Sequence, residues 1–216
     1  MPKPSSGREA VVLLHGLWMT RNVMALLGRR LAAASPARQT HLFGYPSMRA
    51  GMAQNMEALL TFIAGLDADT VHLVGHSLGG VLILNMLNRC APPQPGRVVC
   101  LGSPLRGSAT ASRLQELPGA RVLVGESLEQ VLARPLPDWQ GQREVGVIAG
   151  SRGMGLGRLL RRLDGPNDGT VSVSETCLPG ISDHLVMDVS HTGLVLSREV
   201  AIQTDFFLHR GHFLRD

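Results

Sequence analysis

Hydrophobic and polar positions follow two patterns that alternate along the chain. Short continuous apolar runs that end near glycine are typical of strands buried on both faces of a parallel sheet. Between them, apolar residues recur every three or four positions, as they do along one face of a helix. The predicted strands are residues 10–16, 40–46, 70–75, 96–104, 143–151 and 183–191, and the predicted helices are residues 23–34, 52–66, 79–90 and 197–211.

This alternation predicts an α/β fold in which helices flank a mostly parallel central sheet of about six strands. A chain of 216 residues is expected to form one domain and to bury roughly 70% of its unfolded surface. Residues 1–8 are polar and proline-rich, which predicts a flexible tail. Residues 105–142 contain short helical patterns broken by prolines, and we expect a small cap over the sheet there rather than a second domain.

The composition argues against several kinds of partner. The net charge of +4 comes from scattered arginines among acidic residues, without a basic run or an aromatic–basic stripe, so no nucleic-acid partner is expected. No stretch approaches the roughly 18 uncharged apolar residues of a membrane-spanning helix, so no integral membrane association is expected. The segment "RLLRRL" at 158–163 leaves peripheral lipid contact open, although a solvated helix face is the simpler interpretation.

Cysteine usage and the N-terminal segment predict a compartment. Cys90, Cys100 and Cys177 are odd in number and lack CxxC spacing, which favours neither a disulfide framework nor a zinc site and suits a reducing environment. The apolar run near the N-terminus is followed by Arg21 and Arg29, which a secretion signal would not carry at that place. The prediction is a cytoplasmic protein.

One stretch carries a candidate nucleophile. "TVHLVGHSLGG" sets Ser77 between Gly75 and Gly79, directly after a predicted strand and before a predicted helix. This arrangement is typical of a nucleophile elbow, where the serine has a strained backbone and only glycine fits on either side. The N-terminus of the following helix would direct free N–H groups toward negative charge near Ser77. The alternative is an ordinary glycine-rich turn.

A serine hydroxyl needs a base to become a good nucleophile, and the base needs an acid to orient it. With a strand–elbow–helix motif the usual chain order is serine, acid, histidine. His191 follows the last predicted strand and should share its carboxyl edge with Ser77, which makes it the preferred base. His184 opens that strand and would lie at the opposite edge, whereas His209 and His212 end the last helix and are expected to be solvated.

The preferred acid is Asp168. It stands in "NDGTVSV", where a tight turn is expected to lead into an extended segment, 170–173, and to fix a carboxylate at a strand edge. Asp164, in the same loop, is the alternative and could instead brace that loop. Asp183 and Asp188 belong to the approach to the last predicted strand and are less well placed.

Acyl transfer places negative charge on the former carbonyl oxygen, and each N–H donor aimed at that oxygen is worth about 3–4 kcal/mol. The backbone N–H of Leu78, just after the candidate nucleophile, is one expected donor. The N–H of Leu17, in "LLHGLW", is the other, because Gly16 would let that backbone approach the substrate closely. His15 is expected to brace this loop rather than to act as a base.

Together these segments resemble serine hydrolases of the α/β-hydrolase superfamily, most of all small bacterial lipases and esterases. The matching stretches occur in the family's order and span nearly the whole chain: "VVLLHGL", "LVGHSLGG", "LGSPLRGS", "GPNDGTVSV" and "SHTGLVLS". The resemblance implies an α/β-hydrolase fold with a minimal cap. It also implies Ser77 as nucleophile, Asp168 as acid, His191 as base, and an oxyanion hole formed by Leu17 and Leu78.

The implied activity is cleavage of a small acyl ester or lipid through an acyl-enzyme, with no metal or organic cofactor. A thioesterase, amidase or acyltransferase would use the same triad, because the triad specifies the chemistry and not the substrate. A noncatalytic binding protein with a hydrolase fold is the alternative from another class. The glycine-rich segment at 150–158 lacks the following helix and acidic residue of a dinucleotide site, so it is interpreted as a connector.

Overall fold

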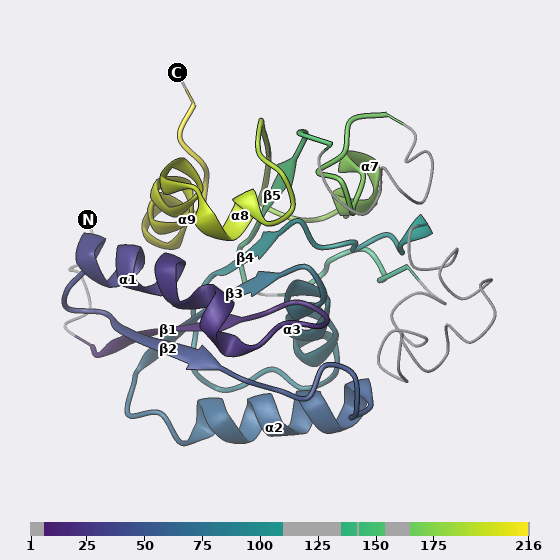
Figure 1. Cartoon of the computed structure of the whole chain (residues 1–216). Coiled ribbons are helices and arrows are strands. Elements are labelled where there is room, and N and C mark those ends of the chain that lie inside the picture. The colour runs from purple at the N-terminus through teal and green to yellow at the C-terminus, as the bar shows by residue number, and fades with distance from the viewer. Residues whose placement is uncertain (1–6, 110–134, 142, 154–164, 216) are drawn as a thin grey trace.

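The computed structural model describes residues 7–109, 135–141, 143–153 and 165–215 (Figure 1). In this part of the chain six parallel strands form one sheet in the order β2-β1-β3-β4-β5-β6. The strands are β1 (Glu9–Leu14), β2 (Gln39–Phe43), β3 (Thr70–His76), β4 (Val98–Leu101), β5 (Val145–Gly150) and β6 (Asp183–Met187). The helices are η1 (Arg21–Met24), α1 (Ala25–Ala34), α2 (Met52–Ala64), α3 (Leu78–Arg89), α7 (Val173–Thr176), α8 (Gly193–Leu196) and α9 (Arg198–Arg210).

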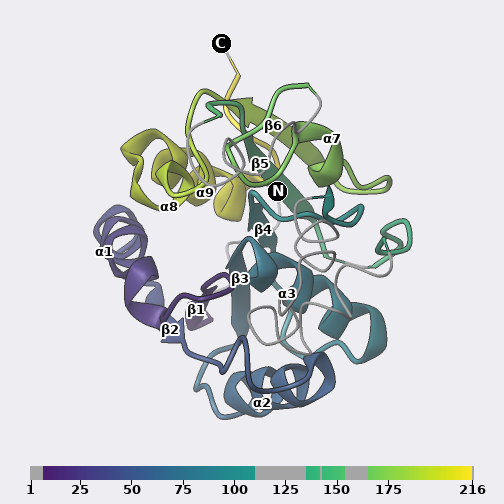
Figure 2. The same cartoon turned by 45° about the vertical axis from the view of Figure 1, so that its right-hand side comes forward.

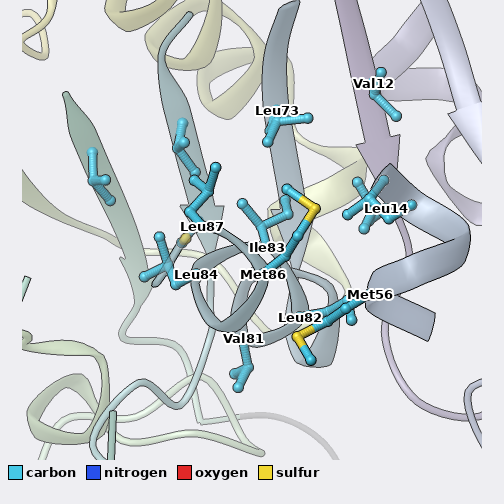
Figure 3. Packing of buried hydrophobic residues seen from close by; sticks show 14 of the residues in the cluster. Val12, Leu14, Met56, Leu73, Val81, Leu82, Ile83, Leu84, Met86 and Leu87 are labelled. Carbon is cyan, nitrogen blue, oxygen red and sulfur yellow. The ribbon is translucent and has the colours of Figure 1, made fainter. Parts of the chain in front are cut away.

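Helices cover both faces of the sheet. Figure 2 shows α1, α8 and α9 on one face and α2 and α3 on the other. Successive residues of a strand point to opposite faces, so Val12 and Leu14 pack with the residues of α3 while Val11 and Leu13 pack with those of α1 and α9. Figure 3 shows the first of these two cores. Burial on both faces explains why the strands read as continuous apolar runs.

The order of the strands determines where the site forms. The chain runs from β1 outward to β2, returns to β3 on the other side of β1, and then continues outward through β4, β5 and β6. The strand order therefore reverses between β1 and β3. In open parallel sheets, ligands bind at the carboxyl edge beside such a switch point. The loops that follow β1 and β3, which hold Leu17 and Ser77, meet there.

The expected strands and long helices are confirmed, with shifts of a few residues at their ends. The prediction of an extended segment at 170–173 is wrong in part. Asn167 and Ser172 form an isolated bridge, but α7 begins at Val173. The side chain of Ser172 accepts the backbone N–H of Glu175, and the Glu175 carboxylate accepts that of Ser172. This capping box stabilises a helical turn despite the β-branched residues.

Parts of the predicted tail and cap lie outside the described residues, namely 1–6, 110–134 and 142, as does the segment 154–164. Residues 105–109 and 135–141 of the predicted cap are described, and the second of these segments packs on the core through buried Leu136 and Trp139. All three cysteines are described and have free thiols. Within the described ranges, no helix combines the length and apolar character needed to cross a membrane.

Candidate active site

Ser77 occupies a sharp bend between β3 and α3. Its backbone has φ 53° and ψ −120°, a conformation that costs a side-chain-bearing residue about 1–3 kcal/mol. The bend brings backbone segments into contact on both sides. A Cβ on Gly75 would lie 2.4 Å from the amide nitrogen of Gly80, and one on Gly79 would lie 2.7 Å from the His15 carbonyl oxygen. This strained bend between a strand and a helix has the backbone geometry expected of a nucleophile elbow.

Asp168, which is buried, pairs with the partly buried His191 at the same edge of the sheet. The Nδ1 atom of His191 lies 2.7 Å from Oδ2 of Asp168, and the Asp168 side chain is only 1% exposed. The other carboxylate oxygen, Oδ1, accepts the backbone N–H groups of Thr170 and Val171 at 2.9 and 2.8 Å. With Nδ1 donating its proton to Asp168, Nε2 of a neutral His191 ring is the atom able to accept a proton.

The end of β4 lies between this pair and Ser77. The N–H of Ser77 donates to the carbonyl of Leu101, at the end of β4, over 2.8 Å. The next residue, Gly102, faces the pair directly, since a Cβ there would lie 2.9 Å from Oδ2 of Asp168 and 3.2 Å from Nδ1 of His191. Gly150, at the end of β5, is equally close, because its Cβ would lie 2.7 Å from that of Asp168. The sequence pattern predicts no role for these glycines beyond ending two strands.

Replacing Gly102 by alanine should damage the site. Its φ of +55° strains any L side chain, and the new Cβ would lie 2.5 Å from Cδ1 of Leu194 and 2.9 Å from the Asp168 carboxylate. Overpacking of this kind costs about 1–3 kcal/mol of unfolding free energy, and we expect a loss of hydrolytic rate with it. Gly107→Ala is the matched control, because its φ is +93° but nothing lies within 4 Å. Equal activity in both variants would contradict the prediction.

The loop after β1 approaches Ser77 closely. A Cβ on Gly16 would lie 3.0 Å from the Cβ of Ser77, so the backbone that leads into Leu17 runs beside the candidate nucleophile. Leu78 is the first residue of α3, where backbone N–H groups have no partner within the helix. Both predicted oxyanion donors therefore belong to segments that flank Ser77.

His15 braces the loop after β1, the role expected of it. Its ring stacks on Tyr45 with ring centres 4.5 Å apart, and Nδ1 donates to the Gly16 carbonyl over 2.8 Å. The Nε2 atom accepts the Tyr45 N–H, and the Tyr45 hydroxyl donates to the His15 carbonyl. Burial lowers the pKa of His15, which keeps the ring neutral and suits this pattern of donor and acceptor.

His76 is a residue for which the sequence pattern predicts no role. It is fully buried next to Ser77, and its ring centre lies 4.6 Å from that of His191. Its Nε2 atom lies 3.0 Å from the His191 carbonyl oxygen, and a carbonyl can only accept a hydrogen bond. The signal in the sequence was its position, one residue before the candidate nucleophile.

The alternative acids and bases lie elsewhere. His184, in β6, contacts the hydroxyl of Thr176 through Nε2 over 2.8 Å. The side chains of Asp183 and Asp188 pair with Arg215 and Arg152 respectively. His209 and His212 are exposed, as expected, and Asp164 lies outside the described residues. Residues 7–109, 135–141, 143–153 and 165–215 contain no group of three potential metal ligands.

Two buried histidines make stability depend on pH. Burial is the main cause that lowers the pKa of His72 and of His76 from 6.5 to about 3. Between these values the unfolded chain binds protons that the folded chain does not, so the free energy of unfolding falls as the pH falls. Each histidine contributes up to about 1.4 kcal/mol per pH unit. We expect urea unfolding at pH 4.5 and 6.5 to show this loss, and His72→Gln to reduce the slope. A stability unchanged between the two pH values would contradict the prediction.

Comparison with known proteins agrees with this architecture. The sequence model of a family described as "Alpha/beta hydrolase family" matches residues 11–197. No curated protein sequence gives a match. The mature lipase BlEst2 of Bacillus licheniformis has a TM-score of 0.70 at 16% identity, covering 98% of this chain and 94% of that one.

Two further solved structures have the same fold. A lipase-esterase related protein from Clostridium acetobutylicum has a TM-score of 0.62 at 15% identity, covering 94% of this chain and 95% of that one. The RedJ thioesterase from the prodiginine pathway of Streptomyces coelicolor has a TM-score of 0.59 at 16% identity, covering 97% and 87%. Identities this low show the fold alone. Because the family match spans most of its length, the chain belongs to the alpha/beta hydrolase family.

Proposed function

We propose that the protein is a serine hydrolase that cleaves carboxylic esters, with Ser77 as nucleophile, His191 as base and Asp168 as acid. The observation that carries the proposal is the 2.7 Å hydrogen bond between buried Asp168 and partly buried His191, at the sheet edge where Ser77 is held in a strained bend. A carboxylate, an imidazole and a strained serine in this arrangement are the parts that nucleophilic acyl transfer requires.

The reaction proceeds in two steps. Nε2 of His191 takes the hydroxyl proton of Ser77 as Oγ attacks the ester carbonyl, and the backbone N–H groups of Leu17 and Leu78 stabilise the oxyanion. The tetrahedral intermediate collapses, the alcohol leaves with the proton from His191, and an acyl-enzyme remains. Water then loses a proton to His191 as it attacks the acyl group. The second tetrahedral intermediate collapses, Oγ of Ser77 leaves with the proton from His191, and the carboxylic acid is released.

Asp168 determines which nitrogen of His191 is free to act as the base in this cycle. Its Oδ2 atom holds the Nδ1 proton of His191, so that only Nε2 faces the chemistry as a base. Its Oδ1 atom is occupied by the N–H groups of Thr170 and Val171, which fix the orientation of the carboxylate. The imidazolium formed during attack is stabilised by the adjacent buried carboxylate.

Hydrolysis of acyl esters tests the activity. Purified protein is assayed with p-nitrophenyl acetate, butyrate and octanoate, and with a thioester and an anilide of butyrate, beside Ser77→Ala. The expected result is Ser77-dependent turnover of at least one ester with a kcat/KM above that of the matched anilide. Turnover of the thioester alone would replace the ester with a thioester as substrate. A folded protein that turns over none of them would leave a binding protein as the better account.

A further inference from the structure

His76 contacts His191 in two ways. It is the last residue of β3, directly before Ser77, and its side chain is fully buried. The two imidazole rings have their centres 4.6 Å apart and their planes inclined by 47°. In addition, Nε2 of His76 donates to the main-chain carbonyl of His191 over 3.0 Å. The residue beside the candidate nucleophile therefore contacts both the ring and the backbone of the candidate base.

These contacts fix a short loop that carries the base. His191 lies between the end of β6 at Met187 and the start of α8 at Gly193. Its backbone N–H donates to the carbonyl of Asp168 over 2.8 Å, and its carbonyl accepts from His76. The peptide groups on both sides of His191 are thus attached to residues that belong to, or adjoin, the other members of the triad.

His76 provides this contact as a neutral donor. With Nε2 donating, Nδ1 is the unprotonated nitrogen of a neutral ring, and it is buried with no hydrogen-bond partner among the described residues. It faces the backbone of Gly16, where a Cβ would lie 3.3 Å away. Burial, together with the charged forms of His191 and His15, lowers the pKa of His76 to about 3. Consequently His76 adds no positive charge beside His191 when that ring becomes an imidazolium.

We propose that His76 is a positioning residue, which holds His191 in place relative to Ser77 through its N–H donated to the His191 carbonyl. The inference rests on the proposed function, because it assigns His76 a part in the reaction of Ser77. It acts through His191 and does not contact the reacting atoms. The hydrogen bond carries the role, and the ring packing supports it.

Two variants separate the donor from the ring. His76→Gln keeps an N–H donor of similar reach and loses the ring, whereas His76→Phe keeps a ring and loses the donor. His72→Phe is the matched control, since His72 is a buried histidine of the same strand whose Nδ1 accepts the N–H of Arg97, away from the triad. Thermal unfolding and circular dichroism show that each variant is folded before it is assayed.

The first readout is the rate constant at which a fluorophosphonate modifies Ser77. A displaced base slows the chemical step strongly, because a misplacement of about 1 Å can cost about a hundredfold. We expect His76→Phe to lower the rate at least about tenfold and to lower kcat without raising KM, while His76→Gln stays within about threefold of the parent. His72→Phe should stay within the same range. Equal rates for His76→Phe and the parent, or equal losses in His76→Phe and His76→Gln, would overturn the proposal.

The second readout needs neither catalysis nor a variant of His76. Nitrogen-15 NMR of the parent distinguishes the ring tautomers, and the far-downfield proton of Nδ1 in His191 reports its bond to Asp168. We expect His76 to be neutral with its proton on Nε2 at pH 7. A proton on Nδ1 of His76, or a charged ring, would contradict the proposed donor. If the parent does not react with the fluorophosphonate but this tautomer is present, the proposed function fails while the contact stands.

Discussion

Replacing Ser77 by alanine is expected to abolish ester hydrolysis while leaving the fold intact. The substitution removes the only atom that forms the acyl-enzyme bond, and losses of about a millionfold in kcat follow removal of such a nucleophile. Residual catalysis would come from the oxyanion donors and from binding. Because Cβ is retained and the Gly75 and Gly79 contacts do not involve the hydroxyl, the free energy of unfolding should change by less than about 1 kcal/mol.

Ser103→Ala is the matched control for this prediction. Ser103 follows β4 at the same edge of the sheet, is fully buried, and its hydroxyl has no hydrogen-bond partner among the described residues. Removing that hydroxyl should leave kcat/KM for a p-nitrophenyl ester within about twofold of the parent. A Ser77→Ala variant that retains more than about 1% of the parent activity would contradict the assignment of the nucleophile, given the expected size of the loss.

Asp168→Asn is expected to lower kcat by about ten-thousandfold through the wrong tautomer of His191. Two backbone N–H groups, from Thr170 and Val171, donate to Oδ1, so the amide oxygen of asparagine would take that place. Its NH₂ group would then face Nδ1 of His191, which would have to accept a hydrogen bond. The ring proton would move to Nε2, and that nitrogen could no longer accept the proton of Ser77.

Asp188→Asn is the matched control, because it also removes a carboxylate, from the loop after β6 that carries His191. Asp188 pairs with Arg152 through side chains that are 73% and 52% exposed. Exposed ion pairs contribute about 0–1 kcal/mol, so stability and kcat should both change little. A kcat of Asp168→Asn within about tenfold of the parent value would contradict the prediction, because loss of the acid that orients His191 is expected to cost about ten-thousandfold.

The architecture could be predicted because its determinants are local. Each buried strand is a short apolar run that ends near glycine, and each long helix carries an apolar stripe, so both periods can be read along the chain. The strained bend at Ser77 could be predicted for the same reason, since Gly75 and Gly79 each lie only two residues from Ser77 in the sequence. The position of His191 after a strand then followed from the parallel arrangement of the sheet.

Features that depend on contacts between distant segments could not be predicted in this way. His76 and His191 are 115 residues apart, and nothing in the local pattern around His76 indicates a hydrogen bond to a loop after another strand. The sequence pattern indicates only that Gly102 ends a strand, although its lack of a side chain leaves room for the Asp168–His191 pair. The capping box of α7 is a local signal, formed by Ser172 and Glu175. The β-branched residues around Ser172 nevertheless favour the prediction of an extended segment.

The most direct test of the central claim is the mass of the intact protein after exposure to a fluorophosphonate, followed by peptide mapping of the adduct. The account predicts a single adduct on the parent, located on Ser77, with no adduct on Ser77→Ala and a greatly slowed reaction in Asp168→Asn. An unmodified parent that is demonstrably folded, or an adduct on any other residue, would contradict the claim that Ser77 is a nucleophile activated by His191 and Asp168.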